Sequence, residues 1–179
     1  IPATIVMPKA APIAKVQATE GYGAKVILHG DCYDEAYAKA MEICEQEGAT
    51  FLHPFDDYEV MAGQGTVALE ILSELPTVDT VIVSACIKQV NPRVRVVGVQ
   101  AEGASAVYQS YKAGRHMCTD GVSTIADGIA VGNPGEKTVA EILKYVDDMV
   151  TVSDNDISSA ILLLMERTKQ IVEPSGASS

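Results

Sequence analysis

Two adjacent carboxylates, Asp56 and Asp57, could do acid–base chemistry. A carboxylate pair can act as general acid and general base when its members lie on either side of a reacting bond. Here both residues fall in the first turn of a predicted helix, where acidic side chains favour the helix dipole, so we expect a structural role. The three histidines, His29, His53 and His116, show no metal-ligand spacing and no catalytic-triad order, and we expect them to be structural or exposed.

The four cysteines, Cys32, Cys44, Cys86 and Cys118, lie far apart with no C-x-x-C spacing. No signal peptide is visible at the start of the sequence. We therefore expect free thiols in a reducing cytoplasm, and neither a disulfide framework nor a zinc site.

Charge and hydropathy exclude two classes of partner. The 179 residues carry a net charge of -11 without a Lys/Arg cluster, so the release of counterions that drives nucleic-acid binding has no source. The longest candidate apolar run, residues 157–165, is bounded by Asp156 and Glu166 and is much shorter than the roughly 18 residues of a membrane span. We expect neither nucleic acid nor a membrane as a partner.

The elements that must position any site alternate between strand-like and helix-like segments. The predicted strands are residues 3–7, 25–29, 80–83, 95–99 and 149–152. The predicted helices are residues 12–20, 34–47, 56–75, 105–113, 136–146 and 154–169, with glycines after three of them and Ser153 as the N-cap of the last. This alternation predicts an α/β fold with parallel strands, and residues 54–57 are the best candidate for a domain boundary.

One connection is unusually short. A crossover between parallel strands normally takes a dozen or more residues, usually including a helix. Here the ten residues Ser84 to Arg93, which include Asn91 and Pro92, make up nearly the whole connection between two predicted strands. This spacing suggests that a segment is missing.

Several segments together resemble the threonine dehydratase (threonine ammonia-lyase) family, with serine dehydratases and serine racemases as close relatives. They follow the family order along nearly the whole chain, which makes them far more specific than any single motif. The segments are residues 1–17 (IPATIVMPKAAPIAKVQ), 30–40 (GDCYDEAYAKA), 53–57 (HPFDD), 62–66 (AGQGT), 123–130 (STIADGIA) and 171–177 (IVEPSGA).

The resemblance implies the second fold type of pyridoxal-phosphate enzymes, with three-layer α/β domains that contain parallel sheets. Residues 1–52 would then be part of a small domain and residues 53–179 part of a large cofactor-binding domain, both incomplete. The cofactor would be pyridoxal 5'-phosphate.

Three family segments have no counterpart here. The family holds the cofactor as a Schiff base on a lysine in an S-F-K-x-R-G type segment and contacts the substrate through an S-S-G-N-H type loop. None of the nine lysines has that context, so no catalytic lysine is assigned. The glycine-rich loop that binds the cofactor phosphate through backbone N–H groups is also absent where Val83 runs directly into Ser84, Ala85 and Cys86.

Two residues match cofactor-binding positions of the family. Glu173 matches the glutamate near the cofactor ring, where a carboxylate can tune ring electronics. Gly128 matches a glycine whose backbone runs close to the cofactor, leaving no room for a side chain. Without the resemblance, Glu173 would be an ordinary glutamate before a proline and Gly128 a turn glycine.

A cation site is implied at Glu102 and the backbone carbonyl of Ala106, as in serine racemases and some dehydratases. A hard cation needs several oxygen ligands, yet the second racemase carboxylate is replaced by Tyr108. The alternative interpretation of Glu102 is a glutamate at the end of a strand.

The resemblance implies a lyase that converts L-threonine to 2-oxobutanoate and ammonia, and L-serine to pyruvate and ammonia, in isoleucine biosynthesis or threonine catabolism. We expect a cytoplasmic homodimer or homotetramer with an amino-acid substrate. Three alternatives remain open. The chain could be a non-catalytic fragment or degenerate homologue, the protein could be a serine racemase, or the missing segments could belong to the protein outside these 179 residues.

Overall fold

Two separate parallel sheets organise the chain, one in each of two units. The structure is a computed structural model that describes residues 1–82 and 87–179. Unit 1 is Ile1–Leu52 and unit 2 is His53–Ser179. That these units are parts of a small and a large domain stays a prediction.

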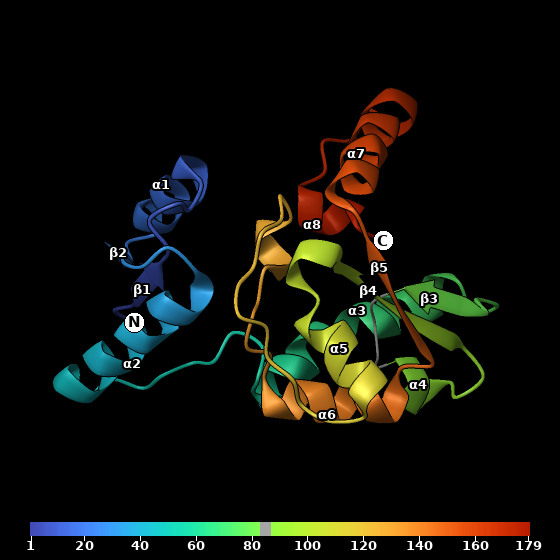
Figure 1. The fold of residues 1–179 in the computed structure, drawn as a ribbon, viewed down its shortest axis with the longest axis horizontal. Coiled ribbons are helices and arrows are strands. Elements are labelled where there is room, and N and C mark those ends of the chain that lie inside the picture. The colour runs from blue at the N-terminus through green and yellow to red at the C-terminus, as the bar shows by residue number, and fades with distance from the viewer. Residues whose placement is uncertain (83–86) are drawn as a thin grey trace. The chain divides into compact units, whose positions relative to one another are not determined.

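Unit 1 is a strand–helix–strand unit followed by a long helix (Figure 1). Its two strands are parallel, with Thr4 opposite Lys25. The long helix ends at Gly48, whose φ of 63° is the left-handed conformation that glycine adopts most readily. The elements are β1 (Thr4–Met7), α1 (Ile13–Gly21), β2 (Lys25–Leu28) and α2 (Tyr33–Glu47).

Unit 2 contains a three-stranded parallel sheet in the order β3-β4-β5, with its helices around it (Figure 1). The strands are β3 (Thr80–Ile82), β4 (Arg95–Ala101) and β5 (Asp148–Val152). The helices are α3 (Tyr58–Glu74), α4 (Ile87–Val90), α5 (Ala106–Ala113), α6 (Glu136–Tyr145), α7 (Asp154–Thr168) and α8 (Pro174–Ala177), with short 3-10 turns η1 (Glu102–Ala104) and η2 (Asp127–Ile129).

The predicted α/β class with parallel sheets is confirmed, and each predicted strand and helix has a counterpart in the structure. The boundaries differ by one or two residues in most cases, and residue 83, predicted as the end of a strand, lies outside the described part of the chain. Four short elements were not predicted, namely α4, α8, η1 and η2, because one turn is too short to show a helical period.

The short connection between β3 and β4 joins two neighbouring parallel strands, with Thr80 opposite Arg95. The described part of this connection contains the single turn α4. The prediction that a glycine-rich loop is missing concerns residues 83–86, which lie outside the described residues.

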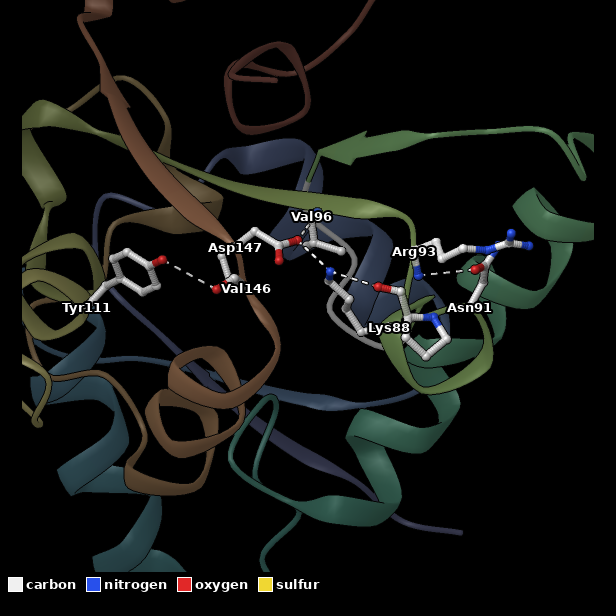
Figure 2. A network of polar contacts seen from close by, with 8 residues as sticks. Lys88, Asn91, Arg93, Val96, Tyr111, Val146 and Asp147 are labelled. Atoms are coloured by element: carbon white, nitrogen blue, oxygen red, sulfur yellow. Dashed lines mark hydrogen bonds and ion pairs between the residues drawn. The ribbon is translucent and has the colours of Figure 1, made fainter.

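An ion pair ties α4 to the sheet (Figure 2). The Lys88 Nζ lies 2.8 Å from an Asp147 carboxylate oxygen, and the same oxygen accepts the Val96 backbone N–H at 2.7 Å. Lys88 also donates to the Pro92 carbonyl at 3.2 Å. One lysine therefore fixes the short helix to the residues around the starts of β4 and β5.

Two clusters of buried side chains hold unit 2 together. The first joins α3 and α4 to β3 and β4, through Ala68, Val81, Ile87, Val94 and Val96. The second lies where β4 ends and joins three later segments, through Ala101, Ala126, Ile157 and Ala177. Burial of these apolar side chains fixes the segments that make up the candidate site.

Candidate functional site

The candidate site lies at the edge of the unit 2 sheet where β4 and β5 end. Ala101 at the end of β4 pairs with Val152 at the end of β5. The residues that follow, Glu102 and Ser153, therefore leave the sheet at the same edge. In open parallel sheets this carboxyl edge is where ligands bind.

A close approach of two backbones brings the segment that begins at Ser123 to this edge. The Ser123 N–H donates to the Gly103 carbonyl at 2.9 Å. A Cβ atom on Gly103 would overlap the Ser123 carbonyl oxygen, so only glycine fits there without a backbone shift.

The Asp154 side chain, at the first turn of α7, holds the next part of this segment. Its carboxylate accepts the Thr124 hydroxyl at 2.5 Å and the Ile125 backbone N–H at 3.1 Å. The Thr124 oxygen in turn accepts the Ala126 N–H at 3.1 Å. The start of α7 therefore anchors the segment immediately before Gly128.

Gly128 and Glu173, the two residues predicted to bind the cofactor, lie close together. The Gly128 N–H donates to Ser175 Oγ at 2.9 Å, across 47 residues of sequence. A Cβ atom on Gly128 would lie 2.7 Å from Ser175 Oγ and 3.7 Å from Glu173 Oε1. α8 thus contacts η2 (Figure 1). Ser175 adds a reason for a glycine at position 128 that the resemblance did not include.

The chemistry of these groups suits one side of a pyridoxal ring. Gly128 and Glu173 are both exposed, so a planar ring could approach them. A carboxylate beside a ring nitrogen favours the protonated nitrogen, and a glycine leaves room for the ring face. The role of these two residues in cofactor binding stays a prediction.

The predicted cation ligands lie at the same edge. Glu102 is exposed in η1, but the Ala106 carbonyl already accepts the Ser110 hydroxyl at 2.8 Å. The Tyr108 ring, at the position of the second racemase carboxylate, lies 5.2 Å from the Lys112 ammonium. The positive charge of Lys112 would repel a metal cation bound near Tyr108 and so disfavours a cation site there. Across residues 1–82 and 87–179, no group of three or more His, Cys, Asp or Glu side chains is arranged to hold a metal ion.

The adjacent aspartates serve two different helices. Asp57 is the N-cap of α3, accepting from Glu59 N at 2.8 Å and Val60 N at 3.2 Å. Asp56 was expected to act on the same helix, and this is wrong: its carboxylate accepts the Thr138 N–H at the start of α6. The partner lies 82 residues further along the chain, which local spacing cannot reveal.

The two histidines of unit 2 bind backbone groups. His53 Nδ1 accepts the Asp56 N–H at 2.8 Å, which closes the turn before α3. The His116 ring lies 2.5 Å from the Pro134 carbonyl oxygen through Nε2. Both contacts are structural.

The remaining candidates contribute little. Cys32, Cys44 and Cys118 are free thiols, and Cys86 lies outside the described residues. In the part of the chain that the structure describes, no helix is long and apolar enough to cross a membrane.

An apolar cavity of about 180 Å³ between β4, β5, α5 and α6 has Gln100 as its one polar lining residue, so it offers no acid–base group.

Three known proteins show what the chain is similar to. It is 47% identical to the L-threonine ammonia-lyase of Thermotoga maritima, over 99% of this chain and 47% of that protein. It superposes on threonine deaminase isoform 2 from Solanum lycopersicum with a TM-score of 0.89 and 36% identity, over 99% of this chain and 52% of that one. For maize serine racemase the TM-score is 0.90 and the identity 33%, over 99% and 57%.

The chain spans about half the length of the curated relatives it matches. The alignment with the Thermotoga protein covers 188 positions, nine more than the 179 residues of the chain, so the relative has residues without a counterpart here. The family described as pyridoxal-phosphate dependent enzymes matches residues 1–179, the whole chain. The resemblance seen in the sequence is confirmed, and the chain belongs to the family of pyridoxal-phosphate dependent enzymes.

Proposed function

We propose that the protein converts L-threonine to 2-oxobutanoate and ammonia with pyridoxal phosphate as cofactor, and L-serine to pyruvate and ammonia as a second reaction. The observation that carries this proposal is the 47% identity, across 99% of the chain, with a protein named L-threonine ammonia-lyase. Identity of this extent supports a shared substrate class more strongly than a shared fold does.

The geometry at the carboxyl edge supports the same function. Bound pyridoxal phosphate supplies an electron sink for chemistry at the substrate Cα. Glu173 and the Gly128 backbone would help to hold the cofactor ring, and the Glu173 carboxylate would tune the electronics of the ring. Asp154 and Ser175 would keep the Gly128 segment in place through the hydrogen bonds described above.

A serine racemase is the second candidate, on the observation that the maize enzyme shares 33% identity and a TM-score of 0.90. Tyr108 and the nearby Lys112 ammonium disfavour the divalent cation expected from the racemase pattern. The ammonia-lyase is therefore the first choice. A monovalent cation at Glu102 and the Ala106 carbonyl stays part of the proposal, and a divalent cation there is the less favoured alternative.

The remaining parts of the proposal follow from the resemblance. Unit 1 would be part of a small domain and unit 2 part of a large one. The protein would be a cytoplasmic homodimer or homotetramer. No lysine of this chain has the family's Schiff-base context, so the 179 residues by themselves would be a non-catalytic scaffold.

The test is an assay of the protein in the form that the cell makes, with and without added pyridoxal phosphate. L-threonine and L-serine are supplied separately, and ammonia, the 2-oxoacid and the two serine enantiomers are measured. Cofactor-dependent release of 2-oxobutanoate from L-threonine is expected. Formation of D-serine without ammonia would favour the racemase, and the absence of any cofactor-dependent reaction would refute both.

A further inference from the structure

Ser175 lies at the centre of the contact between α8 and η2. Its hydroxyl oxygen accepts the Gly128 N–H at 2.9 Å, and its Cβ would be 3.2 Å from a Cβ built on Gly128. No pattern in the sequence links position 175 to position 128. The hydrogen bond therefore belongs to the tertiary fold and not to a local turn.

The peptide group between Asp127 and Gly128 is held on both sides. Its N–H donates to Ser175, and its carbonyl, that of Asp127, accepts the Ala130 N–H at 3.3 Å. A trans peptide is planar, so bonds at its two ends fix the orientation of the whole group. Loss of the Ser175 bond would remove the contact that holds the N–H side of that plane.

Ser175 itself is well placed to act as an anchor. The Ala177 N–H donates to the Glu173 carbonyl at 3.1 Å, and the Ser178 hydroxyl donates to the Ser175 carbonyl at 2.8 Å. Ala177 is buried against Ala126 and Ile157. The backbone of α8 is therefore fixed to the same cluster that carries the segment before Gly128.

We infer that Ser175 is a positioning residue that fixes the Gly128 peptide beside Glu173, so that both present a fixed surface to the cofactor ring. This inference rests on the proposed function for its cofactor part. Ser175 acts through Gly128 and needs no contact with the ring. The Gly128 N–H already donates to the Ser175 hydroxyl. This peptide therefore presents to a ring the face of the glycine that has no side chain.

The experiment compares Ser175→Ala with Ser175→Thr, which keeps the hydroxyl, in the protein as the cell makes it. The first readout is hydrogen exchange at the Gly128 amide in the absence of pyridoxal phosphate. The second is the affinity for added pyridoxal phosphate, measured by fluorescence. Ser159→Ala is the matched control, because its exposed hydroxyl donates to the Asn155 carbonyl within its own helix.

Ser175→Ala is expected to speed Gly128 exchange about tenfold or more, since the amide loses its acceptor. It should also weaken pyridoxal-phosphate binding roughly threefold to tenfold, an effect in the range of one lost neutral hydrogen bond. Ser175→Thr and Ser159→Ala should leave both quantities within about twofold of the original protein.

Unchanged Gly128 exchange in Ser175→Ala would overturn the positioning role. Faster exchange with unchanged affinity would overturn its link to the cofactor while leaving the proposed function intact. If the unaltered protein fails to bind pyridoxal phosphate, the proposed function itself fails, and the exchange result still decides whether Ser175 holds Gly128. A denaturant melt of each variant shows that the fold is retained.

Discussion

The Asp56 carboxylate accepts the backbone N–H of Thr138 at 2.8 Å and its hydroxyl at 3.0 Å. Thr138 is the third residue of α6, and the N-cap of that helix is Gly135, which has no side chain to offer. An N-cap side chain normally accepts from this third N–H. Asp56 supplies the missing cap from a distant part of the sequence.

Replacement of Asp56 by Ala should lower the free energy of unfolding by about 1–2 kcal/mol, as for the loss of an N-cap. Asp56→Asn keeps an oxygen acceptor and should cost less than half of that. Urea unfolding measures both, with Asp120→Ala as the control because Asp120 is exposed. A cost for Asp56→Ala no larger than that of the control would show that the cap contributes nothing.

Gly135 and Asp56 should be energetically coupled. A Cβ on Gly135 would overlap the Asp56 carboxylate, although its φ of -64° suits any residue. Gly135→Ala should therefore cost about 1–3 kcal/mol in the original protein and clearly less in the Asp56→Ala background. A double-mutant cycle by urea unfolding gives the coupling energy, and additive costs would rule the coupling out.

The sequence predicts the local features of these helices well. Ser153 forms the capping box of α7 with Asp156, and Gly48 and Gly114 end α2 and α5 in the left-handed conformation. Each of these features depends on residues within a few positions. The role of Asp56 depends on a tertiary contact, so no local pattern contains it.

The approach of η1 to the segment that begins at Ser123 should be intolerant of any side chain at position 103. Gly103→Ala would place a Cβ on the Ser123 carbonyl oxygen, a backbone atom that cannot rotate away. We expect a loss of about 2–3 kcal/mol in the free energy of unfolding, typical of overpacking. Gly121→Ala is the matched control, because a Cβ there meets nothing within 4 Å, and its cost should stay within about 0.5 kcal/mol. Equal costs for the two variants would contradict the observed approach.

The ion pair of α4 should make stability depend on pH in the acid range. The Asp147 carboxylate accepts hydrogen bonds from Lys88 and from the Val96 N–H, and these bonds hold its pKa below the ordinary value of 3.8. When folding lowers the pKa of a carboxyl group, its ionised form stabilises the protein at pH values above the ordinary pKa. This contribution is lost as the pH falls through the lower pKa of the folded protein.

Asp147→Asn should therefore destabilise the protein near neutral pH and make the loss of stability on acidification smaller than in the original protein. The measurement is the urea midpoint of both proteins at about pH 6 and about pH 3. Asp120→Asn, a change at an exposed aspartate, should follow the original protein. An equal fall in the urea midpoint between the two pH values for Asp147→Asn and the original protein would contradict the stabilising role of the Asp147 ion pair.

The candidate site was predictable only in part. Gly128 and Glu173 were found through their resemblance to family segments, and the structure brings them together at η2 and α8. Asp154 and Ser175 were not found, because each acts on a backbone N–H that is distant in sequence. Backbone partners of this kind leave no signal in residue type or spacing.

Glu173 is the charged group that the proposed function places beside the cofactor ring. Glu173→Gln removes the charge at nearly constant shape and should weaken pyridoxal-phosphate binding or slow turnover about tenfold, the equivalent of about 1.4 kcal/mol. Glu166→Gln, an exposed change on α7, is the control. Fluorescence titration measures binding, and steady-state rates measure turnover. If both are unchanged in Glu173→Gln, Glu173 is not part of the site.

The most direct test of the central proposal is the product formed from L-threonine by the protein in the form that the cell makes, with pyridoxal phosphate present and absent. We expect equal amounts of 2-oxobutanoate and ammonia, formed only when the cofactor is present. Binding of pyridoxal phosphate without release of ammonia from L-threonine or L-serine would contradict an ammonia-lyase, even though the chain belongs to the pyridoxal-phosphate dependent family.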